Sequence, residues 1–443
     1  MDKTQESRKQ QCVEFLQELL RYKTITPDEC GIYEVIKSRL ARAGFAFLHI
    51  DEGGVKNLFV YRLADANLTK KDLAKKDNLD SGVDSSTRAE SSAQILESSA
   101  NSTHFCFMGH VDVVPVGEGW SADAFGAEVK DGFVYGRGAQ DMKGGVAAFV
   151  CAMCDFIEDF EAGRLESSLD SSDLDSGAQT PCLPSLSILL TSDEEGEGTY
   201  GTRYVLEELK ARGLLPNSAI VAEPTCVEKL GDTIKIGRRG SINGVLKIIG
   251  KQGHVAYPEK CINPLEALGA HLRDIAGAKL DSGSEYFKPS QIIITDIRGG
   301  LEAVNVTPSE VKIMFNIRNS PLTSLQSVES YLQNIIAKIK QNAPAAQCEL
   351  TLKQSAKPFI TKADSVLVSM LEKSIESICG VRAERSTSGG TSDARFCAEY
   401  GIDAVEFGVC NDRIHAVDER VKIDEIAGLY SVFYAFLAKV AGA

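Results

Sequence analysis

Two apolar, strand-like runs in the first third of the chain are each followed by candidate metal ligands. The run 104–109 leads into His110 and Asp112, and the run 132–136 is followed by Asp141. In open α/β sheets, functional side chains commonly lie just beyond the carboxyl ends of the strands. The pattern therefore predicts an α/β fold with a metal site at one edge of its sheet.

Apolar periodicity predicts alternating strands and helices in the first half of the chain and again at its end. Alternation of this kind is typical of a mostly parallel, buried sheet covered by helices. The runs 57–62 and 104–109 are expected to pair with each other. The expected strands are 45–50, 57–62, 104–109, 185–192, 218–222 and 402–408, and the expected helices are 8–22, 32–43, 142–160, 199–212, 363–379 and 423–440.

The segment 240–354 has a different order of elements, β-α-β-β-α-β, which is that of a ferredoxin-like unit. Because this unit is complete and its connections are short, we expect a separate domain inserted into the first, which then comprises 1–239 and 355–443. The expected elements of the insert are strands 241–250, 291–297, 310–318 and 348–354 and helices 263–277 and 324–341.

Two polar stretches interrupt the first domain, at about 64–103 and 161–184. They are rich in serine and aspartate and poor in aromatic residues, so they bury too little apolar surface to order themselves. We expect both to be flexible, solvent-exposed insertions.

Composition narrows the class of protein. A chain of 443 residues with 43% hydrophobic and 25% charged residues suits a soluble protein of two or three domains. The net charge of −14 disfavours nucleic acid and anionic membranes as partners. The start of the chain has no signal-peptide pattern, and no apolar run approaches the roughly 20 residues of a membrane span. We therefore expect a cytoplasmic protein whose twelve scattered cysteines are mostly core residues.

Further acidic residues and a histidine follow other apolar runs. A single acid in such a position is usually a solvated loop residue, but several in one sheet converge at the same edge. Two histidines with several carboxylates suit Zn²⁺ or a related ion, and suffice for two ions that share a carboxylate. These additional candidates are Glu194, Glu195, Glu223 and His415.

The spacing also suggests how the site works. Asp112 lies two residues after His110, so on an extended backbone its carboxylate can accept the second N–H of that histidine. Of the adjacent Glu194 and Glu195, one can bind metal while the other carries a proton.

Eight sequence motifs resemble, in order, those of the bacterial succinyl-diaminopimelate desuccinylases, dizinc amidohydrolases of the aminoacylase and carboxypeptidase superfamily. They are GHVDVVP, GRGAQDMKGG, TSDEEG, AEPT, GRRGS, GKQGHVAYP, STSGGTSDARF and IHAVDE. The resemblance covers about residues 10–440 apart from the two insertions. It implies a zinc-exopeptidase-like catalytic domain, a lid and dimerisation domain at 240–354, and hydrolysis of N-succinyl-LL-2,6-diaminopimelate. The alternatives are a related acetylornithine-deacetylase-type enzyme, a metallodipeptidase or a non-catalytic relative; the last would have lost a ligand or the base.

The resemblance also implies a role for each candidate ligand. Asp141 would bridge two Zn²⁺ ions, with Co²⁺ able to replace one of them, and Glu194 would be the general acid and base. His110 and Glu223 would complete the first site, and Glu195 and His415 the second. A cis peptide bond is implied between Asp141 and Met142.

The same resemblance implies a homodimer in which His254 reaches the partner subunit's site and donates to the oxyanion. The alternative is that His254 is an ordinary loop histidine without a catalytic role. For the small-molecule substrate, the arginines are candidates for its carboxylates, although one of a tandem pair is often structural. Departures from the family pattern at Val304, Ala394, Val409 and Asp418 affect the fine substrate contacts. The candidate contacts are Arg238, Arg239, Asn305, Arg318, Ser388, Gly389, Thr391 and Asn411.

Overall fold

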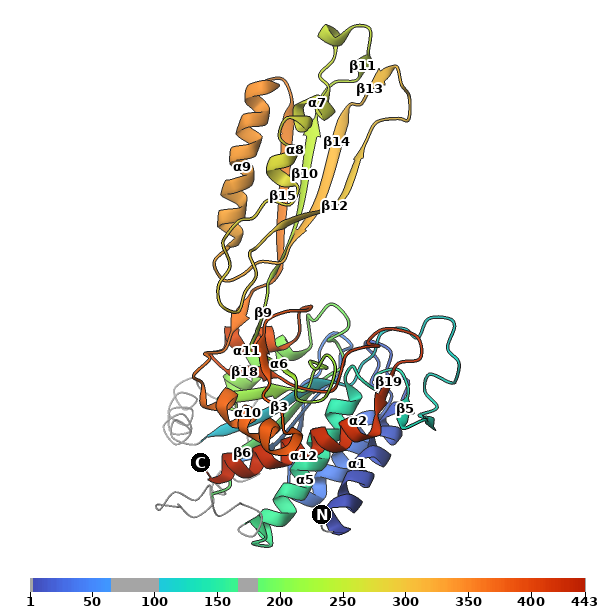
Figure 1. Cartoon of the computed structure of the whole chain (residues 1–443), viewed down its shortest axis with the longest axis vertical. Coiled ribbons are helices and arrows are strands. Elements are labelled where there is room, and N and C mark those ends of the chain that lie inside the picture. The colour runs from blue at the N-terminus through green and yellow to red at the C-terminus, as the bar shows by residue number, and fades with distance from the viewer. Residues whose placement is uncertain (1–2, 65–102, 166–181, 443) are drawn as a thin grey trace, which may run out of the picture. The chain divides into compact units, whose positions relative to one another are not determined.

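The computed structural model describes residues 3–64, 103–165 and 182–442 (Figure 1). The insertion expected at 64–103 lies almost entirely outside these residues, and most of the one expected at 161–184 also lies outside them. The chain forms two compact units. The first comprises Met1–Ile236, Thr361–Ser386 and Ser392–Ala443, and the second comprises Gly237–Ile360 and Thr387–Thr391.

The first unit is built around one large sheet, whose strand order is β1-β2-β6-β3-β7-β18-β8-β17 within the described part of the chain. The central pairs β6–β3, β3–β7 and β7–β18 are parallel, and antiparallel pairs lie on both sides of them. With the parallel pair β8–β17, four of the seven described pairs are parallel and three are antiparallel, so the sheet is mixed with a narrow majority of parallel pairs. The strands span Ala46–His49 (β1), Asn57–Arg62 (β2), His104–His110 (β3), Ser185–Thr191 (β6), Ser218–Val221 (β7), Thr233–Lys235 (β8), Glu384–Ser386 (β17) and Asp403–Glu406 (β18).

The expected pairing of 57–62 with 104–109 is wrong, because β6 lies between β2 and β3. All seven residues of β6 are buried. Such a strand needs cover on both faces and hydrogen-bond partners on both edges, and a central place in the sheet supplies both.

Five of the described helices of the first unit pack on one another around α5 and α12, namely α1, α2, α5, α10 and α12 (Figure 1). Helices α6 and α11 pack instead against each other and against β6 and β18. Gly145, near the start of α5, lies so close to β7 that a Cβ there would be 2.4 Å from the Ala222 carbonyl oxygen. This close approach holds the first turn of α5 beside the end of β7. The helices span Lys3–Leu20 (α1), Ile32–Leu40 (α2), Lys143–Glu161 (α5), Thr202–Arg212 (α6), Val366–Cys379 (α10), Ala394–Glu399 (α11) and Ile423–Gly442 (α12), with a 3₁₀ turn at Ala41–Ala43.

Helix α12 is more apolar than the sequence analysis allowed. Among the described residues it alone is long and apolar enough to cross a membrane, with a mean hydropathy of 1.2, but 61% of that window is buried in the fold. It packs against α5, α10 and α1. A helix that is covered by other elements on several sides is apolar around most of its circumference. We therefore interpret α12 as a core helix of the first unit.

A small sheet of order β19-β5-β4 corrects the expectation for 132–136. That run forms β5, which pairs with β19 and β4 and not with the large sheet. The pairing sets Arg420 opposite Tyr135 and so aligns the loops beside the two strands. The strands are Val129–Lys130 (β4), Phe133–Tyr135 (β5) and Arg420–Lys422 (β19).

The second unit contains an antiparallel four-stranded sheet of order β12-β14-β10-β15. Alternate residues of β14 are buried, and they pack with the apolar face of α9 in one core. The elements follow in the order strand, helix, strand, strand, helix, strand, with the expected helix 263–277 divided in two. They span Ser241–Ile249 (β10), Pro264–Gly269 (α7), Leu272–Ile275 (α8), Ile292–Gly299 (β12), Glu310–Ile317 (β14), Leu325–Asn342 (α9) and Gln347–Ala356 (β15).

The boundaries of the second unit differ from the expected 240–354. Gly237–Arg238 (β9) pairs with Phe359–Ile360 (β16). The two segments that connect the units therefore belong to the second unit. The loop 387–391, expected in the first domain, also belongs to it. The second unit further contains a two-stranded antiparallel sheet of Gly253–His254 (β11) and Val306–Thr307 (β13), and a 3₁₀ turn at Pro258–Lys260.

Candidate metal centre

Three neighbouring strands deliver candidate ligands to one edge of the large sheet. His110 is the last residue of β3. Glu194 and Glu195 follow β6, and Glu223 follows β7. Because β6, β3 and β7 are parallel and adjacent, their carboxyl ends lie side by side. The convergence expected from the sequence is therefore present.

Two further candidates arrive on loops. Asp141 lies between β5 and α5, and its peptide bond to Met142 is cis, as the family resemblance implied. His415 lies between β18 and β19 and has a positive φ of 61°. Neither residue follows a strand end of the large sheet directly, so the small sheet and α5 position them.

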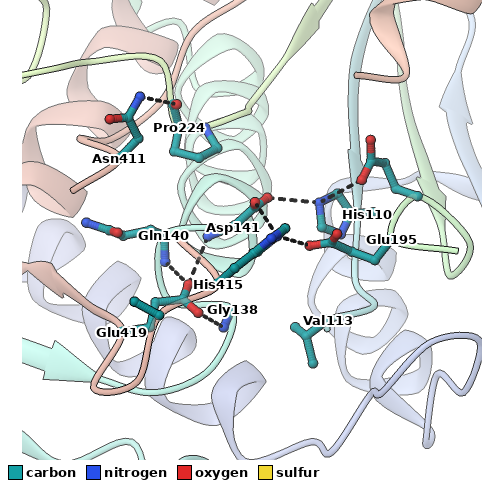
Figure 2. Close-up of polar contacts among 12 residues, drawn as sticks. His110, Val113, Gly138, Gln140, Asp141, Glu195, Pro224, Asn411, His415 and Glu419 are labelled. Atoms are coloured by element: carbon teal, nitrogen blue, oxygen red, sulfur yellow. Dashed lines mark hydrogen bonds and ion pairs between the residues drawn. The ribbon is translucent and has the colours of Figure 1, made fainter. Parts of the chain in front are cut away.

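Asp141 stands between the two histidines, with one oxygen toward each (Figure 2). His110 Nε2 lies 3.1 Å from Asp141 Oδ1, and His415 Nε2 lies 3.4 Å from Asp141 Oδ2. His415 Nε2 is also 2.8 Å from Glu195 Oε1. Among the described residues, the potential ligand atoms form three groups within 4.8 Å of one another. Two of them share Asp141: His110, Asp141 and Glu223 in one, and Asp141, Glu195 and His415 in the other. The third consists of His110, Glu194 and Glu195.

The electrostatics of the cluster favour cations. Hydrogen bonds to Asp141 and Glu195 raise the pKa of His415 to about 10. Burial opposes ionisation of Asp141, but hydrogen bonds from the two histidines hold its pKa below the usual range. The protonated histidines thus offset carboxylate charge that a bound metal ion would otherwise offset. The two groups that share Asp141 contain three carboxylates, which would offset most of the charge of two divalent ions; they are Asp141, Glu195 and Glu223. Nitrogen and carboxylate ligands in this ratio suit zinc and its neighbours.

Glu194 is placed differently from Glu195. Its Oε2 is 4.0 Å from His110 Nε2, and its side chain is 14% exposed. Burial, and then the nearby Glu223 carboxylate, raise the pKa of Glu194 well above its ordinary value. A carboxyl group that readily takes up a proton at the edge of such a cluster suits proton transfer.

Asp112 is fully buried, and its contacts correct one expectation. The nearest acceptor to His110 Nδ1 is the main-chain oxygen of Asp112, at 2.8 Å, whereas its Oδ1 is 3.5 Å away. Its Oδ2 accepts from the Thr26 hydroxyl at 2.8 Å and from the Glu195 amide at 3.1 Å. Asp112 therefore orients His110 through its backbone and ties the ends of β3 and β6 together. The contact still leaves His110 Nε2 directed at the cluster.

His254 and Asn305 lie together in the second unit. His254 is exposed, and it pairs with Val306 in the antiparallel β11–β13 sheet. The Ala256 amide donates to His254 Nδ1 at 3.1 Å, so in the neutral ring Nε2 carries the proton. The structure thus presents His254 as a hydrogen-bond donor on the surface of its unit.

The tandem arginines divide into two kinds. Arg238 donates to the carbonyl oxygens of Ser388 and Gly390, at 3.0 and 3.5 Å, and so holds the loop 387–391. Gly389 has a φ of 104°, which favours glycine, and a Cβ there would lie 2.3 Å from this guanidinium and displace it. The candidate Thr391 lies at the end of the same loop. Arg238, predicted as a substrate contact, thus has a structural contact that the sequence did not reveal.

Arg239 and Arg318 form the second kind. Burial, followed by repulsion from Arg318, lowers the pKa of Arg239. Among the described residues, the buried Arg239 Nε has no hydrogen-bond partner. Two neighbouring guanidinium groups of this kind favour an anion.

Asn411 lies in the first unit, where its amide donates to the Pro224 carbonyl oxygen at 3.4 Å (Figure 2). The sequence analysis missed three residues that contact the loops of the centre, namely Arg137, Gln140 and Glu419. They stand within the GRGAQD and IHAVDE motifs, which were the available signal.

The family model for peptidase family M20/M25/M40 matches residues 106–166 and 175–439, and the chain belongs to this family. It is 49% identical over 429 residues to a succinyl-diaminopimelate desuccinylase of Helicobacter hepaticus, covering 95% of each chain. It is 47% identical to the enzyme of the same name from Wolinella succinogenes, covering 95% of this chain and 97% of that one.

Solved structures share the fold at low sequence identity. Aminopeptidase PepT from Bacillus cereus matches with a TM-score of 0.70 and 16% identity, over 98% of this chain and 99% of that one. This similarity identifies the mixed α/β fold of the family.

Proposed function

We propose that this chain hydrolyses N-succinyl-LL-2,6-diaminopimelate to succinate and LL-2,6-diaminopimelate, in diaminopimelate and lysine biosynthesis. The observation that carries the proposal is the pair of ligand groups that share Asp141, with Glu194 beside them. The name of the two relatives, which match nearly the whole chain at close to half identity, supports the choice of substrate.

The centre would hold two Zn²⁺ ions, one of which Co²⁺ can replace. His110, Asp141 and Glu223 would bind one ion, and Asp141, Glu195 and His415 the other; both sets are close enough for this. A pair of divalent ions supplies, when bound, Lewis acidity toward an amide carbonyl and a lower pKa for water.

Glu194 would move the proton that the reaction requires. It accepts a proton from the water whose oxygen bonds to the amide carbon, and returns it to the nitrogen when the carbon–nitrogen bond breaks. One water is consumed, and a carboxylate and a protonated amine are formed, so that both protons of the water end on the nitrogen. The raised pKa of Glu194 suits a group that must hold this proton between the two transfers.

The second unit would act as the lid and dimerisation domain and supply the remaining contacts. Arg239 and Arg318, whose guanidinium groups lie near each other, would bind a substrate carboxylate. Asn305, Ser388, Gly389, Thr391 and Asn411 remain candidate contacts, and Arg238 would act mainly by holding the loop 387–391. His254 would donate to the oxyanion in the partner subunit of a cytoplasmic homodimer.

The test is a comparison of substrates together with metal content. We expect two zinc ions per chain, loss of activity on chelation, and recovery on adding Zn²⁺. The value of kcat/KM for succinyl-diaminopimelate should exceed that for acetylornithine and for a dipeptide by about 100-fold or more, because a site built for a charged acyl group rejects substrates that lack it. Faster turnover of acetylornithine or the dipeptide would refute the proposed substrate.

A further inference from the structure

The carboxylate of Glu419 lies buried beneath Asp141 and contacts the backbone of Asp141 (Figure 2). Its Oε1 accepts the amide protons of Gln140 and Asp141 at 2.9 and 3.1 Å. Its Oε2 accepts the Gly138 amide at 3.0 Å and a guanidinium N–H of Arg137 at 2.8 Å. With four donors on two oxygens, Glu419 is a hydrogen-bond acceptor for the loop and not a metal ligand.

Arg137 extends this arrangement to the loop that carries His415. It donates to the carbonyl oxygens of Ala416 at 3.1 Å and His415 at 3.3 Å. It also donates to the Val116 carbonyl at 3.2 Å, and its guanidinium lies 5.2 Å from the centre of the Trp120 ring. Arg137 is only 2% exposed, so all these contacts are made away from solvent.

Gln140 joins the same two loops by its side chain. Its Nε2 donates to Asp412 Oδ1 at 2.6 Å, and its Oε1 accepts from the Arg413 amide at 2.9 Å. The loop before α5 and the loop before β19 are therefore connected through side chains at three points. The β5–β19 pairing adds a main-chain bond from the Gly136 amide to the Glu419 carbonyl at 2.9 Å.

The backbone at His415 makes such support necessary. His415 and Asp418 both have positive φ values, 61° and 56°. A residue with a side chain persists in this region only when its surroundings over-determine it. The hydrogen bond from Arg137 to the carbonyl oxygen of His415 supports the backbone at this positive-φ residue.

We infer that Glu419 and Arg137 are positioning residues that set the separation of Asp141 and His415, and thereby the affinity of the centre for its metal ions. This inference rests on the proposed function, because it assumes that the two residues are ligands. The alternative is an ordinary buried ion pair that only stabilises the fold. The first unit offers such a pair for comparison: Arg8 and Asp159 join α1 to α5, elsewhere in the same unit.

The test measures Zn²⁺ affinity of the metal-stripped protein by competition with a coloured chelator. In Glu419→Gln, the amide NH₂ must face backbone N–H groups, so the Asp141 loop shifts. Because Asp141 is shared, we expect both ions to bind about 10–100-fold more weakly, the usual effect of losing a residue that orients a ligand. Glu419→Asp retains the charge and should recover part of the affinity. Arg137→Lys should weaken mainly the ion that His415 holds.

Asp159→Asn is the matched control, since it also neutralises a buried carboxylate paired with arginine. It should lower the melting temperature and leave Zn²⁺ affinity unchanged. If folded Glu419→Gln binds both ions within twofold of the wild type, the inference is overturned. Should Glu419→Gln not fold, wild-type affinity in Arg137→Lys for the His415-side ion overturns it equally. If the wild-type chain itself binds fewer than two Zn²⁺ ions, the proposed function has failed instead.

Discussion

At the scale of single residues, the roles in the centre follow from which atoms are already engaged. Both oxygens of Glu419 are occupied by donors, and Asp112 Oδ2 is held by Thr26 and the Glu195 amide. Glu195 faces His415 at 2.8 Å, whereas Glu194 reaches His110 only at 4.0 Å. Two adjacent glutamates on one loop thus have different environments, which supports the proposed division of ligation and proton transfer between them.

Replacement of Glu194 by glutamine should therefore separate binding from chemistry. Glu194→Gln retains the volume of the side chain but cannot accept the proton, so we expect kcat to fall by about 10²–10⁴-fold. Zinc content should stay at two ions per chain. Glu197→Gln, on the exposed part of the same loop, is the control and should retain full activity. An unchanged kcat in Glu194→Gln would rule out this base.

The ligand candidates were predictable from the sequence, and their supporting residues were not. His110, Glu194 and Glu223 follow apolar runs, and this position can be recognised in the sequence even when the order of strands in the sheet is unknown. Glu419 contacts backbone amides of residues nearly 280 positions away. Backbone groups are identical at every position, so no feature of the sequence shows which of them a buried carboxylate will bind.

At the scale of elements, one carboxylate joins three helices behind the sheet. Asp159 of α5 accepts from Arg8 of α1 at 2.5 and 3.0 Å and from Tyr434 of α12 at 2.6 Å. Arg164 donates to it at 2.7 Å. Burial opposes its ionisation, but the hydrogen bonds from Arg8, Tyr434 and Arg164 outweigh it and lower the pKa of Asp159 to about 2.

Loss of this charge should destabilise the first unit in a pH-dependent way. Asp159→Asn removes charge-assisted hydrogen bonds, and we expect the free energy of unfolding to fall by about 1–3 kcal/mol at pH 7. Because the pKa is lower in the folded chain than its ordinary 3.8, the stabilisation is present above that value. It is lost as the pH falls toward 2. Urea unfolding of both proteins between pH 7 and pH 3 measures the difference, which should narrow at the acid end.

Glu158→Gln provides the comparison for this experiment. Glu158 neighbours the same arginines, but its side chain is 66% exposed. Exposed ion pairs contribute roughly 0–1 kcal/mol, so this variant should remain close to the wild type. An equal loss of stability in both variants would contradict the role given to Asp159.

The strands and helices that were expected agree with the structure within about five residues. Strands β8 and β17 and helix α11 were not expected, and the expected order of strands in the sheet is wrong. Periodicity reports whether a run is buried on one face or two, and β6 was correctly expected to be buried. Periodicity does not show which strands are hydrogen-bonded neighbours. The expectation that β2 pairs with β3 depends only on their order in the chain. The loop 387–391 was misassigned for a similar reason, since its contact with Arg238 spans 150 positions.

At the scale of the whole molecule, the chain combines a unit that contains the metal centre with a unit that carries further functional candidates. The first holds every predicted metal ligand. The second holds His254, whose Nε2 is the donor in the neutral ring, and the pair Arg239 and Arg318. The second unit also exposes apolar side chains on and around β12, including Ile293 at 52% and Leu301 at 64%.

Mixing two inactive variants tests whether the proposed dimer shares its sites. His254→Ala chains retain Glu194 but lack the donor, and Glu194→Gln chains retain the donor but lack the base. If His254 acts in the partner subunit, one site of each mixed dimer is complete. Random reassociation of equal amounts makes half of the dimers mixed, so activity should recover to about a quarter of the wild-type value. If His254 acts within its own chain, each site of a mixed dimer lacks one group. Verified mixed dimers without activity would then exclude action in the partner subunit.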